Sequence, residues 1–303
     1  MNNGSPDNTM VAQDACQKSI DLFQYLAPEI GVILAGGNAT QGLAGTLGGL
    51  GHFSVGIRGN GLDMSLPQVD RVTPNTRGAR QDTYPVEQKF LGGATADLAL
   101  GVFKGFSTSG FGSADVLVSA TYLPSYTGES IEVKEPGGSF KLGLGAKVGL
   151  LRESAALPGV SLSYLVRETP RVDITARSGE DRLFLNDVNV KAKSWRAVAA
   201  KKLLFLGIGA GFGQDAYDSH ATITVSVAPR QATQGGTGGP IDLTQKLTRN
   251  NVFATAWITS TVLRIVGEVG RVSGGSISTY NSFEGVQPAD ARTYYSIGVS
   301  FGR

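Results

Sequence analysis

The chain has 303 residues, of which 41% are apolar and 17% are charged, and it contains 42 glycines. The charged fraction is below the roughly 25% of ordinary soluble proteins, and glycine is about twice as frequent as usual. A net charge of +2 gives no electrostatic reason to expect a nucleic-acid partner. The single cysteine, Cys16, excludes an intramolecular disulfide.

The N-terminal segment predicts one helix. Residues 1–10 are polar and lack the apolar core of a signal peptide, so we expect a mature chain from which a signal has been removed. Between Asp14 and Leu34, four apolar residues follow at spacings of three and four: Ile20, Phe23, Leu26 and Ile30. This spacing predicts an amphipathic helix that Asp14 caps and that ends at Gly36-Gly37. No apolar run reaches the roughly 18 residues of a transmembrane helix.

The rest of the chain alternates apolar and small or polar residues with period two. Residues 139–151 are the clearest case, with Phe140, Leu142 and Leu144 on one face and Gly143 and Lys147 on the other. Such a segment is longer than an ordinary strand of about five or six residues and suits a tilted membrane strand of about nine to eleven. Ten segments show the pattern: 52–65, 90–103, 113–123, 139–151, 160–177 (broken by Pro170), 187–199, 203–213 (continuing through Ile223, Val225 and Val227), 250–261, 265–272 and 292–303.

The connections between these segments alternate in length. Short turns are expected near residues 107–112, 153–158, 201–202 and 262–263, and long connections at 67–87, 125–137, 178–186, 228–249 and 273–291. Short periplasmic turns and long outside loops are typical of outer-membrane barrels. We therefore predict an all-β fold, a closed antiparallel transmembrane β-barrel of about ten strands over residues 51–303. Both chain ends are expected on the periplasmic side.

The last strand carries a resemblance to known proteins. Tyr295, Ile297, Val299 and Phe301 share one face, and Gly298 lies three residues before Phe301. This arrangement resembles the C-terminal strand signal of bacterial outer-membrane proteins, in which a glycine and a later aromatic residue are read by the assembly machinery. Arg303 departs from the usual terminal aromatic residue. The resemblance implies an outer-membrane location, with Tyr295, Gly298 and Phe301 as the assembly signal.

Residues 1–50 precede the barrel, and two placements of their helix are open. One is a periplasmic helix that caps the bottom of the barrel. The other is a plug in the lumen, which loosely resembles the N-terminal plugs of outer-membrane transporters for hydrophobic compounds. Those transporters are longer chains with more strands.

The strand phases also predict which charged side chains line the lumen. The candidates are Arg58, Asp97, Asp115, Lys141, Lys147, Arg167, Arg171, Asp173, Lys191, Lys193, Glu268 and Arg292. They could form a network of ion pairs that fills the barrel. Alternatively, the many lumen-facing glycines could leave an open path, and the surplus of basic groups would then favour anions.

Catalytic and metal sites are not expected. Asp218 and His220 form an Asp-x-His pair similar to that of the ten-stranded outer-membrane proteases, but no second acidic pair accompanies it. His52 is expected near the periplasmic end of the barrel, whereas Asp218 and His220 are expected near the outer rim. Neither metal-ligand spacing nor a phosphate-binding glycine loop is present, so we predict a protein that is not an enzyme and needs no cofactor.

The predicted function is passive passage of small or hydrophobic solutes through the outer membrane. The alternative is a filled structural barrel whose outside loops bind a partner or anchor a surface assembly. The expected partners are outer-membrane lipid, the assembly machinery and a small solute.

Overall fold

The computed structural model describes residues 6–37, 45–68, 71–106, 111–123, 125–128, 131–229 and 235–302. One helix, α1 (Pro6–Ala35), precedes all the strands. The long strands are β1 (Phe53–Pro67), β3 (Val86–Phe103), β4 (Ser113–Tyr122), β7 (Phe140–Leu151), β8 (Gly159–Glu168), β10 (Asp181–Leu203), β11 (Leu206–Val227), β12 (Gly236–Ser260), β13 (Leu263–Ser273) and β15 (Arg292–Gly302). Short strands in the connections are β2 (Thr83–Tyr84), β5 (Tyr126–Thr127), β6 (Ile131–Lys134), β9 (Val172–Ser178) and β14 (Ser282–Phe283).

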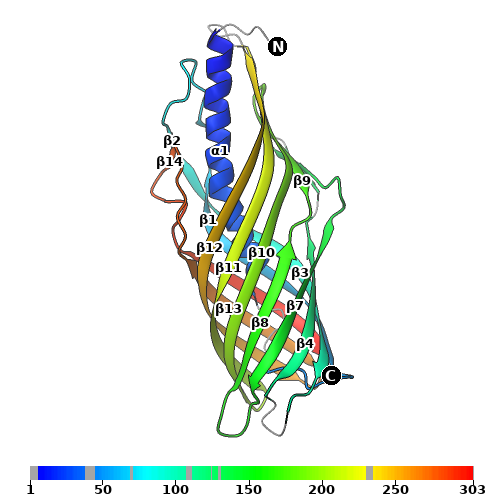
Figure 1. Cartoon of the computed structure of the whole chain (residues 1–303). Coiled ribbons are helices and arrows are strands. Elements are labelled where there is room, and N and C mark those ends of the chain that lie inside the picture. Colours follow the sequence, from blue (N-terminus) through cyan, green and yellow to red (C-terminus); the bar gives the residue numbers. More distant parts are fainter. Residues whose placement is uncertain are drawn as a thin grey trace.

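The ten long strands form a ring (Figure 1). Each pairs antiparallel with its neighbours in the order β1-β3-β4-β7-β8-β10-β11-β12-β13-β15. The last strand pairs with the first, from Ser54 opposite Gly302 to Leu62 opposite Tyr294. Ring closure pairs the backbone groups of strands that a bilayer would otherwise leave unpaired. The predicted antiparallel barrel of about ten strands is therefore confirmed.

Individual strands agree closely with the sequence pattern, with two exceptions. The predicted connection 178–186 is short, because β10 already begins at Asp181, and the larger exception follows β11. The prediction of a break at Pro170 is confirmed, because β8 ends at Glu168 and β9 begins at Val172. The segment 228–249 was expected to be a loop, but much of it belongs to β12, which begins at Gly236. Thr and Gly are the commonest residues in this stretch, and pairing with the long β11 makes it a strand.

The outer face of the ring carries an apolar belt at the short-turn end. Ile57, Leu144 and Ile297 are each between 63% and 69% exposed, although they are aliphatic. Aromatic rings meet in pairs toward both edges of the belt: Phe53 with Phe301 near the short turns, and Tyr122 with Phe140 and Trp195 with Phe212 at the other edge. Outer-membrane barrels show such an apolar band between aromatic girdles.

Beyond the belt, β10, β11 and β12 extend past the rest of the ring (Figure 1). The outward face of β11 changes from Ile208 and Phe212 to Gln214, His220 and Thr222. Its apolar residues Ile223, Val225 and Val227 instead point inward. The prediction that this strand continues through these three residues is confirmed, and they face inward because α1 covers the inner side of the extension.

The helix α1 lies against this extension, with its N-terminal end at the far tip from the short turns (Figure 1). It starts at Pro6 and not at Asp14, and proline suits the first turn of a helix. It ends at Ala35 as expected, where Gly37 adopts a φ of 71°. No helix in the described ranges has both the length and the hydropathy to cross a bilayer.

Two expectations about the N-terminal segment are thereby corrected. The N-terminal end of α1 lies at the tip of the extension, whereas β15 ends near the short turns, so the described chain begins and ends at opposite ends of the barrel (Figure 1). The helix also does not cap the short-turn end. It occupies the interior, because its apolar face finds partners on the inner side of β10, β11 and β12.

The outward orientation of the belt can be tested by a charge substitution. Leu144→Arg places a guanidinium near the middle of the belt, and we expect it to lower the free energy of unfolding in lipid vesicles by about 2–4 kcal/mol. Thr244→Arg on the extension is the control and should change it by less than about 0.5 kcal/mol. Denaturant titration measures both variants. Equal effects of the two substitutions would contradict the membrane boundary.

Candidate functional site: the helix inside the barrel

Three arginines from the barrel wall converge on the C-terminal end of α1. Arg167 on β8 donates to the carbonyl oxygens of Leu34 and Ala35 at 3.2 and 3.1 Å. Arg196 on β10 donates to Ala35 O at 2.6 Å, and Arg58 on β1 donates to the carbonyl of Gly36. All three side chains are buried. We call this set the arginine clamp.

The arginine clamp supplies hydrogen-bond donors to carbonyls at the C-terminal end of α1. The last four carbonyls of a helix lack intrahelical partners, and the helix dipole concentrates negative charge there. In water these carbonyls would be solvated, whereas here they lie inside the ring. Cations at this end stabilise a helix by roughly 0.3–1 kcal/mol, and up to about 2 kcal/mol when partly buried. Asn60 on β1 is a fourth donor residue, and its amide nitrogen donates to Ile33 O at 3.1 Å.

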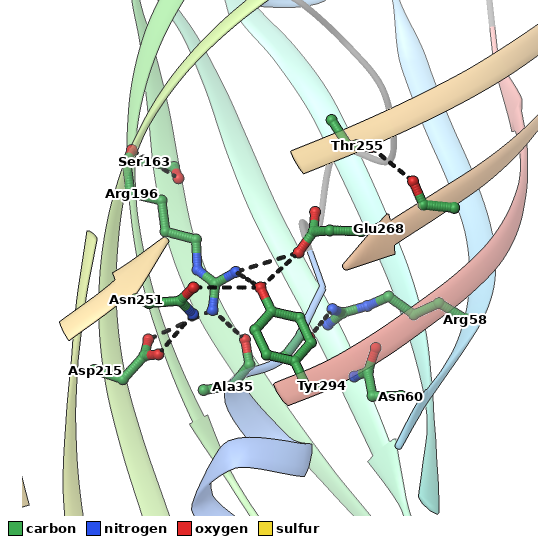
Figure 2. A network of polar contacts seen from close by, with 12 residues as sticks. Ala35, Arg58, Asn60, Ser163, Arg196, Asp215, Asn251, Thr255, Glu268 and Tyr294 are labelled. Carbon is green, nitrogen blue, oxygen red and sulfur yellow. Dashed lines mark hydrogen bonds and ion pairs between the residues drawn. The ribbon is translucent and has the colours of Figure 1, made fainter. Parts of the chain in front are cut away.

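Arg196 is the centre of a larger network, which Figure 2 shows. Its guanidinium lies 3.5 Å from Asp215 and 3.7 Å from Glu268, and it donates to the Tyr294 hydroxyl at 3.4 Å. The Tyr294 hydroxyl donates to Glu268 at 2.8 Å, and Asn251 donates to Asp215 at 3.1 Å. These groups come from β10, β11, β12, β13 and β15. The network therefore connects one half of the ring to the helix end. Arg58 is held in the same way by Asp97 at 2.5 Å.

The outer half of α1 is held by the long connections. Asp14, Lys18, Asp21 and Glu29 form one polar stripe along the helix. Asp14 accepts backbone N–H groups of residues 75 and 80 at 2.6 and 2.8 Å, and Asp21 accepts those of residues 280 and 281 at 3.0 and 2.7 Å. Lys18 pairs with Asp82 at 2.7 Å and Glu29 with Arg292 at 2.8 Å. Burial raises the pKa of the Glu29 carboxyl, and Arg292 opposes that rise.

A buried arginine fastens one of these connections to the barrel. Arg249 on β12 is fully buried and donates to the carbonyl oxygens of Gly274, Ala289 and Asp290 at 3.0, 3.0 and 2.6 Å. The connection between β13 and β15, which contacts α1 at Asp21 and Tyr25, is thereby fastened to β12.

After α1, Thr46 and Leu47 hydrogen-bond to the barrel wall at the short-turn end of the lumen. The Leu47 backbone N–H donates to both oxygens of Asp115 at 3.1 and 2.9 Å, and Thr46 donates to Ser113 at 2.6 Å. Leu47 also packs against Ala99, Leu117 and Leu165. Residues 38–44 lie outside the described ranges. On either side of them, the N-terminal segment occupies the lumen at the clamp and again near the short turns.

Most of the predicted lumen residues lie inside the ring. Seven are buried: Arg58, Asp97, Asp115, Lys147, Arg167, Glu268 and Arg292. Lys141 lies near the upper end of β7, where its side chain is 42% exposed and 3.7 Å from Glu168. Arg171 is exposed and pairs with Asp187 at 3.3 Å, outside the ring. Asp173 belongs to β9 and accepts the Asp187 backbone N–H at 2.9 Å.

Two predictions on β10 are wrong. Lys193 is exposed and Lys191 partly so, whereas Ala192, Ser194 and Arg196 between and beyond them are buried. The sequence pattern misleads here because the inner face of β10 carries Val188, Val190 and Val198, which pack inside the barrel. Arg196, the centre of the network, was therefore missed. Arg196 has the same phase as these valines, and the opposite phase of the lumen candidates Lys191 and Lys193, so the sequence pattern does not single it out.

The lumen glycines do not mark an open path. Gly207 lies opposite Trp257, and a Cβ there would be 2.0 Å from the indole ring. Gly211 lies opposite Phe253 and Gly270 opposite Tyr294, with corresponding distances of 2.4 and 2.3 Å. The glycines thus leave room for the large ring of the cross-strand neighbour, and that ring fills the space.

The Asp-x-His pair does not assemble a cleft. Asp218 and His220 point outward on the extension, where His220 lies 3.9 Å from Asp187 and Asp218 lies 4.0 Å from Lys246. His52 lies at the short-turn end and contacts Gly49 O at 3.3 Å. Within the described ranges, three or more metal-ligating side chains do not cluster anywhere.

Removal of the central arginine tests the clamp. Arg196→Ala removes the guanidinium that contacts Asp215 and Glu268, and it removes one of the donors to Ala35 O. Breaking a buried ion pair from one side typically costs about 3–5 kcal/mol. We expect a loss of that order in the free energy of unfolding. Arg171→Ala, on an exposed arginine, is the control and should change it by less than about 0.5 kcal/mol. A similar small loss for both variants would refute the clamp.

Comparisons with known proteins identify no family. No family model and no curated protein matches the chain. Among solved structures, the chain is similar to Ail, the attachment invasion locus protein of Yersinia pestis, in complex with the heparin analogue sucrose octasulfate. The identity is 8% and the TM-score 0.29, with 83% of this chain and 99% of that chain covered.

Two further matches are weaker. The anion-selective porin of Comamonas acidovorans has 7% identity and a TM-score of 0.18, over 82% of this chain and 98% of that one. Outer-membrane expressed OmpT of Vibrio cholerae has 8% identity and a TM-score of 0.17, over 83% and 97%. These scores are too low to carry an argument about function. The closed ring, the outer apolar belt and the polar interior nevertheless make this chain a β-barrel of the outer-membrane type.

Proposed function

We propose that the protein is a filled outer-membrane barrel that holds α1 within it and presents the N-terminal end of that helix on the cell surface. The observation that carries the proposal is the arginine clamp, which fixes the end of α1 inside the ring. Passive passage of small or hydrophobic solutes would need a path around the helix and the aromatic rings that cover the lumen glycines.

The sidedness follows from the connection lengths. Short turns of outer-membrane barrels face the periplasm and long connections face outward. The extension of β10, β11 and β12 is at the long-connection end, so it would project from the surface with α1 at its core. Its outward face is polar, with Gln214, His220 and Thr222 on β11, which suits water. This extension and the connections bound to α1 would form the surface that meets a partner.

Insertion would depend on the last strand. Tyr295 and Phe301 are exposed on the outer face of β15, and Gly298 lies on its inner side. We propose that the assembly machinery reads this strand, which then closes the ring against β1.

Electrical recording tests whether the lumen is filled. In planar bilayers we expect the intact protein to show no steady conductance. A variant lacking residues 1–45 removes α1 and should show discrete conductance steps, because the helix that fills the lumen is then absent. A folded intact protein with open steps of the same size would contradict the filled barrel and favour a passive channel.

Surface labelling tests the sidedness. An epitope placed before Pro6, behind a cleavable export signal, should bind antibody on intact cells. The same epitope inserted at the turn between β10 and β11, beside Phe205, should bind only after the outer membrane is permeabilised. Antibody access to both positions, or to the turn alone, on intact cells would overturn the proposed orientation.

A further inference from the structure

An apolar cavity lies between the lower half of α1 and the barrel wall. It has a volume of about 220 Å³. Among the described residues, the lining consists of aliphatic side chains and glycines with a few threonines and one tyrosine, and none of these lining residues is charged. The residues that define it are Ile30, Ile33, Leu91, Val133, Val172 and Val190. An apolar cavity of roughly 150 Å³ is large enough to bind benzene, so this one can take a larger apolar group.

The cavity lies behind a gap in the strand ladder. β3 pairs with β1 from Val86 to Leu100, but its pairing with β4 starts only at Ala94, opposite Tyr122. From Val86 to Gly93, the described residues show no strand on the other edge of β3. The opposite wall of the cavity is formed by β6, β9 and β10, which pair with one another. Cavity residues therefore come from both sides of the gap.

The lining residues at this gap are open to the outside. Leu91 has the phase of the inward-facing residues of β3, such as Thr95 and Asp97, yet it is 38% exposed. Tyr122 also lines the cavity and is 40% exposed. A leucine that points inward and remains exposed is one that no neighbouring side chain covers. Leu91 and Tyr122 thus mark the mouth of the cavity.

The mouth adjoins the lipid-facing belt. The ring of Tyr122 contacts that of Phe140 on the outer face, with centroids 4.9 Å apart. Phe90, the neighbour of Leu91 on the outward phase, is 65% exposed. The apolar surface is therefore continuous from the belt, past the aromatic girdle, into the cavity. A group that enters here comes from the membrane more readily than from water, because it remains in contact with apolar surface throughout.

We propose that this cavity binds one alkyl chain of a membrane amphiphile, which enters between β3 and β6 and leaves its polar head group outside. The uncharged lining suits a hydrocarbon and offers no ion-pair partner for a head group. In the bound state the chain would lie against Ile30 and Ile33 of α1 and support the helix just above the arginine clamp. The proposal concerns the wall of the barrel and stands whether or not the lumen conducts.

Lipid retention tests the proposal. The protein is folded in vesicles of phosphatidylethanolamine and phosphatidylglycerol, transferred to a mild detergent, washed and examined by native mass spectrometry. We expect one retained phospholipid per protein. Leu91→Trp fills the mouth and should reduce retention at least tenfold. Phe90→Trp is the matched control on the lipid-facing side and should retain the lipid as the unsubstituted protein does.

Several results would overturn the proposal. These are the absence of retained lipid in the unsubstituted protein, equal retention in Leu91→Trp, and a loss in Phe90→Trp as large as that in Leu91→Trp, which would assign the lipid to the belt. A parallel titration with decanoate tests the other source of an alkyl chain, and binding of decanoate without phospholipid would refute the membrane origin. If Leu91→Trp does not fold, Val133→Trp on the opposite wall of the mouth replaces it.

Discussion

The burial of a helix end inside a ring of strands is the constraint on which the rest of this structure depends. Carbonyls at the C-terminus of α1 must find donors where water is largely excluded. Three strands supply arginines for them, and those arginines need carboxylates and a tyrosine in turn. The buried arginines and carboxylates around the end of α1 therefore neutralise one another, and they are arranged about the helix end.

The same constraint explains the unusual composition. An interior that holds a helix and its charged partners has little room for side chains on every strand, so glycines alternate with large rings across neighbouring strands. The outer face is free of this limit and carries aliphatic and aromatic residues against lipid. The high glycine content thus follows from the packing of the inner face of the strands, and the low overall charge follows from the apolar outer face.

The sequence predicted the strand number, most strand ends and the closed antiparallel fold, because alternation and connection length are local properties. It also placed seven of the charged side chains in the interior. It failed on Lys191 and Lys193, because valines of β10 pack inside the barrel and not against lipid. A bulge in β10 between Asn186 and Asn189, where Asp187 has a φ of 54°, further disturbs the alternation near its start. The position of α1 was not predictable, since its contacts reach residues more than 250 positions away in the chain, such as Asn281.

The closure of β15 on β1 has a consequence for the order of assembly. These two strands come from nearly opposite ends of the sequence, yet they form the seam through which the ring is completed. A chain cannot be threaded sideways through a finished hydrogen-bonded wall. The N-terminal segment must therefore be inside before the seam closes, or enter later through an open end of the ring. Pairing across such a sequence separation is slow, because a long loop must close before contacts form. Pairing of β1 with β15 would then set the rate of assembly. It would also determine whether the helix can enter or leave the lumen through the wall or only through an open end of the ring.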